Sequence, residues 1–238
     1  MSNGSGSVLV VSDQMLMAET IRAALATQGW DARLARWPER EGGLVPVPPG
    51  TSLGVLVSDL EPTARLERAQ RILAAWPGHW LVLTGAPRGP RWGAALDADA
   101  LGVLSADIGL EELAAVLQRA RAGVRPMDPA EVNRLRHSWR AVLAEQRELA
   151  ERMRRLTRRE LTILGLLYAG GNVAGIAAQL GVSEATVRSQ VRAVLRKLAV
   201  NSQLAAVAAY ASLVEERRRP AGGGTTQNPG NPHVVQRP

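Results

Sequence analysis

The sequence contains no Cys, no Phe and a single Lys, and these absences exclude several kinds of chemistry. Without Cys there can be no disulfide, no thiolate metal site and no cysteine nucleophile. The three His, at positions 79, 137 and 233, lie far apart and lack the spacing of metal ligands. No nucleophile–base pair or phosphate-binding loop can be recognised either, so we predict no metal site and no enzymatic activity.

Long apolar segments are also missing. No apolar run approaches the roughly 20 residues needed to span a bilayer. The first residues, MSNGSGS, lack the charged and apolar regions of a signal peptide. We therefore expect a cytoplasmic protein without membrane contacts, and a length of 238 residues suggests one or two domains.

Charge is unevenly distributed along the chain. Residues 1–126 hold 12 Arg against 13 acidic residues, a net charge of −1. Residues 127–238 hold 16 Arg and the single Lys against 9 acidic residues, a net charge of +8. A neutral first half and a basic second half predict a regulatory domain joined to a nucleic-acid-binding domain.

Four short helices are predicted between residues 156 and 210. Thr157 and Glu160 form a capping box at the start of the first helix, and Gly170 ends it. Gly181 ends the second helix, and Ser183 is a favourable N-cap for the third. The helix–turn–helix geometry between residues 173 and 198 would allow the third helix to enter a DNA major groove.

The third helix is predicted to have one apolar and one basic face. The residues expected to face inward are Val187, Val191, Val194, Leu195 and Leu198. Arg188, Arg192 and Arg196 are four residues apart and share the other face with Ser189. A guanidinium group can bind guanine O6 and N7 together, so this face could read DNA. An ordinary solvated basic face is the alternative.

The stretch LTRRELTILGLLYAGGNVAGIAAQLGVSEATVRSQVRAVLRKL closely resembles the LuxR/NarL-type helix-turn-helix family, with a match over roughly residues 156–212. The resemblance implies a bacterial transcription regulator that binds double-stranded promoter DNA as a homodimer and could contact RNA polymerase. Its third helix would read DNA, and its fourth would take part in dimerisation.

The resemblance also assigns roles by position. Arg188, Ser189 and Arg192 match base-facing positions, whereas Thr186, Gln190 and Lys197 match positions near the DNA backbone. The family often has His at the position of Gln190 and Arg at the position of Gln203.

The first half alternates short apolar strands with helices. Strands are expected at residues 8–11, 31–36, 53–57, 80–84 and 100–104, and helices at residues 15–28, 63–76 and 109–122. This alternation predicts an α/β domain with a five-stranded parallel sheet, flavodoxin-like, with helices on both faces. Functional groups of such sheets gather at the carboxyl ends of the strands.

The side chains at those strand ends make the first half resemble a response-regulator receiver domain. By position, Asp59 matches the phosphoacceptor, Thr84 the switch hydroxyl and Asp13 one of the two acids that bind Mg²⁺. The receiver pocket would comprise Ser12, Asp13, Thr84 and Ala106 around Asp59.

Two positions depart from the receiver pattern. Ser12 stands where the family has its first acid, and Ala106 stands where it has Lys. No Lys precedes Lys197, so no shift of register restores it. Because Mg²⁺ prefers carboxylate oxygens, we predict that ordinary phosphotransfer to Asp59 is weak or absent, with no cofactor beyond weak Mg²⁺ binding at Asp13 and Asp59. Control by a ligand, a partner or dimerisation would replace it, and a phosphorylation-switched regulator using Asp59 is the alternative.

Residues 39–52, EREGGLVPVPPGTS, occupy the place where receiver domains have a helix. Three Pro disfavour a helix there, so an exposed sheet face could accept a small-molecule ligand or a protein partner. Five Trp lie in this half, at positions 30, 37, 76, 80 and 92. We expect them in the core, and a ligand cage is the alternative.

A long helix is predicted between the two halves. Asp128 is its N-cap, Pro129 its first residue and Glu131 the capping-box partner. A heptad seam follows, made of Val132, Leu135, Trp139, Val142, Gln146, Leu149, Met153 and Leu156. The seam predicts a dimerising, signal-carrying linker, and packing of the same stripe on the chain's own domains is the alternative.

The predicted organisation has four parts. A receiver-like domain spans residues 1–126, a helical linker with a possible coiled coil spans 127–155, a LuxR-type helix-turn-helix domain spans 156–214, and a disordered tail rich in Gly, Pro and Asn spans 215–238.

Overall fold

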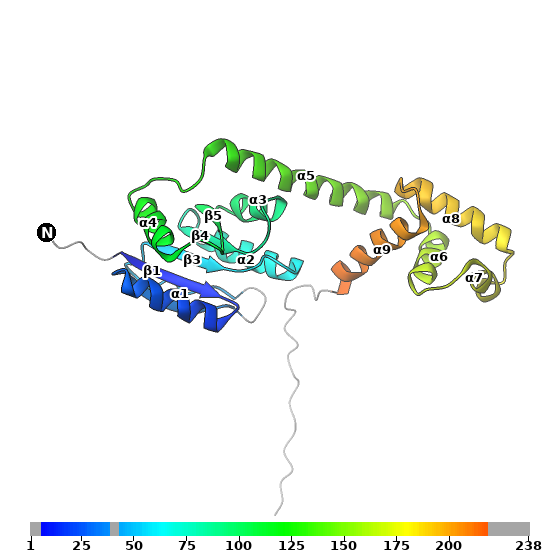
Figure 1. The fold of residues 1–238 in the computed structure, drawn as a ribbon. Helices are drawn as coiled ribbons and strands as arrows, with labels where there is room; N and C mark the ends of the chain where they lie inside the picture. Colours follow the sequence, from blue (N-terminus) through cyan, green and yellow to red (C-terminus); the bar gives the residue numbers. More distant parts are fainter. Residues whose placement is uncertain (1–5, 39–42, 219–238) are drawn as a thin grey trace, which may run out of the picture. The chain divides into compact units, whose positions relative to one another are not determined.

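The computed structural model describes residues 6–38 and 43–218, and the chain divides into two compact units, Met1–Glu148 and Leu149–Pro238. The first unit contains a parallel sheet, and the second is helical (Figure 1). Among the described residues, no helix combines the length and apolar character needed to cross a bilayer.

The sheet of the first unit has five parallel strands in the order β2-β1-β3-β4-β5. The strands are β1 (Ser7–Ser12), β2 (Asp31–Arg36), β3 (Leu53–Val57), β4 (Trp80–Thr84) and β5 (Gly102–Ser105). This is the order of flavodoxin-like folds, and it confirms the predicted fold class. In this topology the carboxyl ends of β1, β3 and β4 meet at one edge of the sheet.

Helices cover both faces of the sheet, as predicted (Figure 1). Helices α1 (Met15–Thr27) and α4 (Leu110–Arg121) bury Leu25 and Leu117 in one apolar cluster. Helices α2 (Thr63–Ala75) and α3 (Pro90–Asp97) bury Leu73 and Trp92 in a cluster that contains Leu9 of β1. The sheet therefore separates two apolar cores.

The connection between β2 and β3 has no helix in its described parts, residues 37–38 and 43–52, as the proline content predicts. The Trp side chains of this unit belong to the cores. Trp30, Trp80 and Trp92 are buried, and Trp37 and Trp76 are half-buried against the cluster of α2 and α3. The expectation of core tryptophans is confirmed, and no cage of several tryptophans forms.

Helix α5 (Pro129–Arg154) begins where predicted, because Asp128 Oδ1 accepts hydrogen bonds from the backbone N–H groups of Ala130 (2.8 Å) and Glu131 (3.1 Å). Its first half packs on the first unit through Leu135 and Trp139. Gly93 of α3 makes this contact possible, since a Cβ atom there would overlap the backbone carbonyl of Leu135.

Polar contacts hold the same part of α5. The guanidinium group of Arg136 donates to the carbonyl oxygen of Leu96 from Nε (3.1 Å) and Nη2 (2.7 Å). That carbonyl lies in the last turn of α3 and also accepts a hydrogen bond from the backbone N–H of Asp99 (3.1 Å). Arg140 pairs with Asp97 at 2.7 Å. The first half of α5 is therefore an integral part of the first unit.

The predicted dimerisation seam comprised Val132, Leu135, Trp139, Val142, Gln146, Leu149, Met153 and Leu156. The first three are half-buried against the core of the first unit, and the buried Met153 and Leu156 belong to the core of the second unit. These five residues pack within the chain, as in the alternative that the sequence left open. Pairing of the helix with a second copy of the chain stays a prediction.

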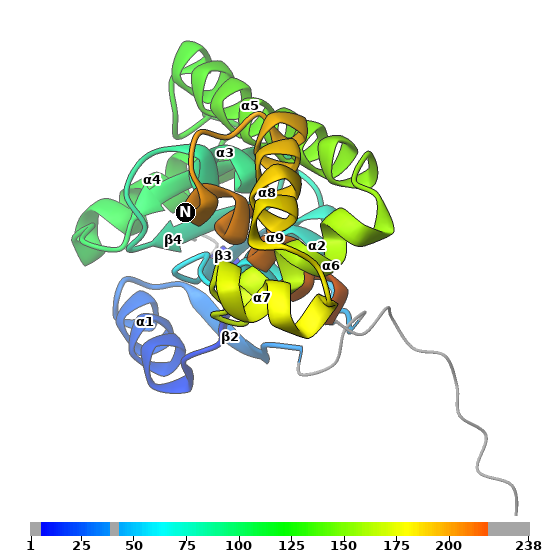
Figure 2. The same cartoon turned by 90° about the vertical axis from the view of Figure 1, so that its right-hand side faces the viewer.

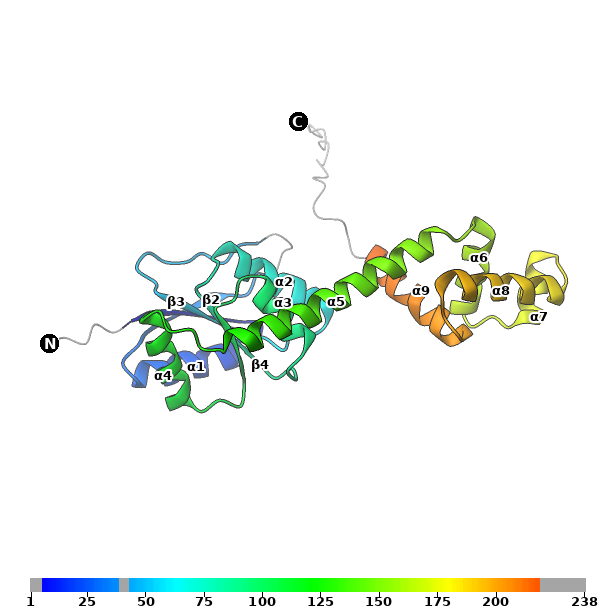
Figure 3. The same ribbon diagram turned by 90° about the horizontal axis from the view of Figure 1, so that it is seen from above.

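The second unit has four helices, α6 (Arg158–Tyr168), α7 (Val173–Leu180), α8 (Glu184–Leu198) and α9 (Gln203–Arg218) (Figure 2, Figure 3). The predicted reciprocal Thr157–Glu160 capping box is present, and Ser202 Oγ accepts a hydrogen bond from the Ala205 N–H (3.1 Å) at the start of α9. Helix α9 continues to Arg218, so residues 215–218 of the predicted tail are helical. The rest of that tail lies outside the described residues.

The close approach of α3 and α5 generates a first prediction. Gly93→Ala should destabilise the first unit by roughly 1–3 kcal/mol, because the added methyl group meets the rigid helix backbone at Leu135. Denaturant unfolding followed by tryptophan fluorescence measures this, since all six Trp lie between residues 30 and 139. Gly109→Ala, where a Cβ atom meets nothing within 4 Å, is the control. Equal stability of the two variants would contradict the assigned contact.

Candidate functional site

Helix α8 begins after a tight turn that the sequence marks clearly. Gly181 ends α7 in the left-handed conformation (φ 64°, ψ 37°), which Gly adopts without steric cost. Ser183 then caps α8, and its Oγ accepts a hydrogen bond from the backbone N–H of Thr186 (3.1 Å). These two residues fix the direction in which α8 leaves the turn.

The apolar side of α8 is anchored in the second unit. Val187, Val194 and Leu198 are buried, and Val191 and Leu195 are half-buried against the two apolar clusters of the unit. This arrangement matches the predicted inward face. It determines the rotation of α8 about its own axis, and therefore which residues face solvent.

The opposite side of α8 is a solvent-exposed basic face that carries Arg188, Ser189, Arg192 and Arg196. Arg188 Nη2 lies 2.6 Å from Glu184 Oε2 in an exposed i,i+4 ion pair. Arg192 and Arg196 form no ion pair with any residue that the structure describes. The arrangement suits binding of phosphates or of guanine edges, because exposed guanidinium groups can donate several parallel hydrogen bonds.

Three further predicted site residues differ in their surroundings. Thr186 is exposed, and its hydroxyl lies 2.9 Å from Ser183 Oγ. Gln190 is half-buried. Lys197 is directed to the protein interior, with Nζ 2.7 Å from Glu160 Oε2 and 3.4 Å from the carbonyl oxygen of Arg155. Its ammonium group is therefore engaged within the chain, unlike the guanidinium groups of the exposed face.

Glu160 is the buried polar centre of the second unit, with 4% of its surface exposed. Its Oε2 accepts hydrogen bonds from Lys197 Nζ (2.7 Å) and from the backbone N–H of Thr157 (2.7 Å). Burial opposes ionisation of Glu160, but the hydrogen bonds from Lys197 and Thr157 and the charge of Lys197 outweigh it and lower the pKa. A capping box of α6 is thus joined to the last turn of α8.

The receiver-like residues also meet in space. Ser12, Asp13, Asp59 and Ala106, from the ends of β1, β3 and β5, line one cleft of about 120 Å³. Thr84 is buried at the end of β4, and its Oγ1 accepts a hydrogen bond from the Ala86 N–H (3.1 Å). The strand order brings these positions together, as the topology predicts.

Arg65 adds a feature that sequence reasoning missed. Its Nε lies 2.5 Å from Asp13 Oδ2, although that oxygen accepts no directed hydrogen bond from the described residues, so the contact is mainly one of charge. A guanidinium group on α2 therefore neutralises the acid that would bind Mg²⁺. No group of three or more acidic or His side chains in the described part of the chain could hold a metal ion. With Asp13 paired and Ser12 at the position of the first acid, these residues do not fit a Mg²⁺ site.

Comparison with known proteins finds a family match within the second unit. Residues 154–210 match the family described as bacterial regulatory proteins, luxR family, which confirms the LuxR-type helix-turn-helix resemblance. No curated protein matches the sequence.

Several solved structures are similar to the chain. The response regulator ChrA of a heme-sensing two-component system is 23% identical, with a TM-score of 0.43, over 89% of this chain and 98% of ChrA. FixJ from B. japonicum is 20% identical, with a TM-score of 0.37, over 88% of this chain and 98% of FixJ. RcsB from Salmonella typhimurium is 19% identical, with a TM-score of 0.36, over 87% of this chain and all of RcsB.

The depressed pKa of Glu160 generates a prediction about acid stability. A carboxylate with a folded-state pKa below its unfolded value adds stability above the unfolded pKa, and this stability is lost as the pH falls through the folded pKa. Glu160→Gln should therefore cost roughly 1–3 kcal/mol at pH 7, and this cost should shrink below about pH 4. Far-ultraviolet circular dichroism measures unfolding of the helical unit, with exposed Glu184→Gln as control. A cost independent of pH would show that the charge of Glu160 does not contribute.

Proposed function

We propose that this chain, whose residues 154–210 match the luxR family of bacterial regulatory proteins, is a sequence-specific DNA-binding transcription regulator. The proposal rests on the exposed arginine face of α8 in the helix-turn-helix unit. The opposite face of α8 packs into the core of that unit. With 15 residues, α8 is about 22 Å long, enough to lie in a major groove.

Reading of bases would rest on Arg188, Ser189 and Arg192. Arg188 is paired with Glu184 in the free protein, so binding to guanine would require it to exchange one anionic partner for another acceptor. An exposed ion pair of this kind contributes about 0–1 kcal/mol to stability, so breaking it costs little free energy. Arg192 needs no such exchange, and we expect it to contribute most to sequence choice.

Contacts to phosphates would come from Thr186, Gln190 and Arg196, which flank the reading positions. We assign a different role to Lys197. Because its Nζ is held by buried Glu160 and by the Arg155 carbonyl, it would position α8 rather than contribute a free charge to the DNA backbone. The salt dependence of DNA binding should therefore reflect the exposed arginines.

A homodimer is the natural DNA-binding form for such a domain. Two reading helices about 34 Å apart, one turn of DNA, would meet an inverted or direct repeat. Since most of the α5 stripe packs within the chain, the dimer contact would lie mainly outside that stripe.

Control of the protein is proposed to be independent of ordinary Asp phosphorylation. Asp59 has no Lys near it, Ser12 replaces one acid, and Arg65 pairs with Asp13. The cleft therefore lacks the carboxylates for Mg²⁺ and the ammonium group that would hold a phosphoryl oxygen. A phosphorylation-switched regulator using Asp59 is the second candidate, favoured only by the position of Asp59 at the end of β3.

The DNA-binding proposal predicts the effect of Arg192→Ala. On a site selected from random DNA, this variant should lose roughly 1–3 kcal/mol of binding free energy and relax the preference for one base pair. Electrophoretic shift or fluorescence anisotropy measures both. Arg134→Ala, an exposed residue of α5, should change neither. An equal loss on unrelated DNA would show that Arg192 contacts only the backbone, and no binding by the wild type would refute the proposal.

The regulatory proposal predicts no stoichiometric aspartyl phosphate after incubation with acetyl phosphate and Mg²⁺. Intact-protein mass spectrometry would detect the added phosphoryl group, and Asp59→Asn provides the baseline. Stoichiometric labelling that Asp59→Asn abolishes would establish the phosphorylation-switched alternative.

A further inference from the structure

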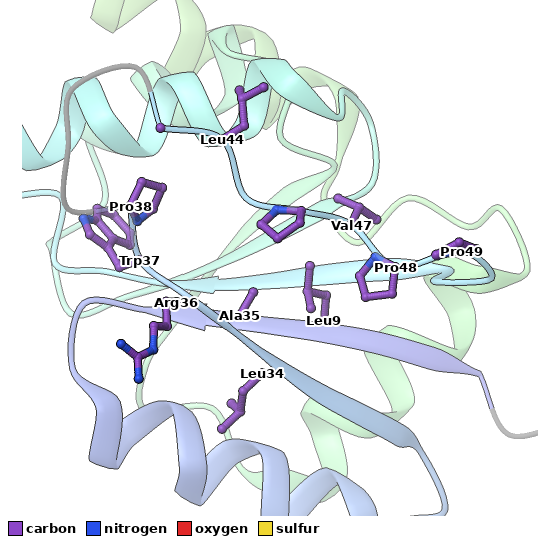
Figure 4. Close-up of a pocket in the computed structure, with 12 residues that line it drawn as sticks. Leu9, Leu34, Ala35, Arg36, Trp37, Pro38, Leu44, Val47, Pro48 and Pro49 are labelled. Carbon is purple, nitrogen blue, oxygen red and sulfur yellow. The ribbon is translucent and has the colours of Figure 1, made fainter.

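Two adjoining hollows in the first unit share Trp37 as a common wall. One is an open groove of about 900 Å³ between the β1–β2 side of the sheet and the proline-rich segment that follows β2 (Figure 4). The other is a cleft of about 250 Å³ beside α2. They differ in character, because the groove is mainly apolar and the cleft is lined by charged side chains.

The groove exists because no helix covers this part of the sheet in the described residues. Leu9 and Ala35 come from the strands, and Leu44 and Val47 come from the proline-rich segment. Trp37 and Pro38 lie at one end, and Pro48 and Pro49 at the other (Figure 4). Leu44 is 73% exposed at the rim. A concave apolar surface of this size is typical of a site for an apolar ligand.

The neighbouring cleft contains a guanidinium nitrogen without a hydrogen-bond partner among the described residues. It is lined by Arg65 and Arg68 of α2 together with Asp13 and Trp37. Arg65 is paired with Asp13, whereas the buried Nε of Arg68 finds no hydrogen-bond acceptor among the described residues. Leaving a buried N–H of a charged group unbonded is costly, so its position points to an acceptor that the described residues do not supply.

The charges define the class of acceptor. Among the described residues that line the cleft, two arginines against one aspartate give a net charge of +1. A single carboxylate matches this charge and the planar geometry of a guanidinium group. A dianion such as a phosphate monoester would bring excess negative charge close to Asp13, which disfavours it.

We propose that the first unit binds an amphipathic monocarboxylate, with its apolar body in the groove and its carboxylate on Arg68 beside Trp37. Asp13 also lines the cleft that contains Asp59, so the bound carboxylate would lie next to the edge of the sheet where receiver domains accept a phosphoryl group. The inference names a ligand class for the control proposed above, but it does not depend on DNA binding.

Isothermal titration calorimetry of the full chain tests the site with decanoate, used below its micelle concentration, and with decanol as the uncharged analogue. Decanoate should bind with a stoichiometry of one and more tightly than decanol. Arg68→Gln should weaken decanoate binding at least tenfold and leave decanol binding unchanged, because it removes only the carboxylate contact. Arg71→Gln, an exposed arginine of the same helix, is the matched control and should behave like the wild type.

Two results would overturn the inference. One is the absence of saturable decanoate binding to the wild type, and the other is an equal loss of affinity in Arg68→Gln and Arg71→Gln. If Arg68→Gln does not fold, the two affinities of the wild type provide the test. Equal affinities for decanoate and decanol would show that no carboxylate is recognised. Because DNA binding is measured separately, its failure and the failure of this site are distinguishable.

Discussion

The carboxylate of Glu160 connects the parts of the second unit on which the candidate DNA surface depends. It completes the N-terminal cap of α6 through Thr157 and binds Lys197 in the last turn of α8. The apolar side of α8 fixes its rotation, and the Lys197 bond fixes its C-terminal end against α6. The two constraints together keep the arginine face exposed. An exposed basic helix without such anchoring would present the same charges with no defined geometry.

In the first unit, too, charged side chains connect segments that are distant in sequence. Arg65 on α2 forms an ion pair with Asp13 at the end of β1. Arg136 donates to the carbonyl oxygen of Leu96 in the last turn of α3 and thereby ties α5 to the unit. Arginine makes both contacts, which agrees with a sequence that has one Lys and 28 Arg among its 29 basic residues. Arg68, whose Nε has no acceptor among the described residues, is the exception that motivates a ligand.

The features that the sequence did not predict share one cause. The heptad stripe of α5 shows that the helix has an apolar face, but periodicity does not show what covers that face. Gly93 was not recognised as the residue that lets α5 approach α3. The bond between Lys197 and Glu160 was not predicted because the two residues are 37 positions apart, and Arg65 was missed because it lies far from Asp13 in sequence. Each case depends on a contact between distant segments.

The sequence by itself determined the strands, the helices other than α3, several helix caps and the arginine face of α8, because apolar periodicity and capping chemistry act over a few residues. It also predicted that the described residues between β2 and β3 form no helix, since proline acts locally on its own backbone. Only the tertiary structure decided which charges are free. Whether Arg192 is available, Lys197 engaged or Asp13 neutralised depends on which distant side chains the fold brings within a few ångströms, and no local pattern carries that information.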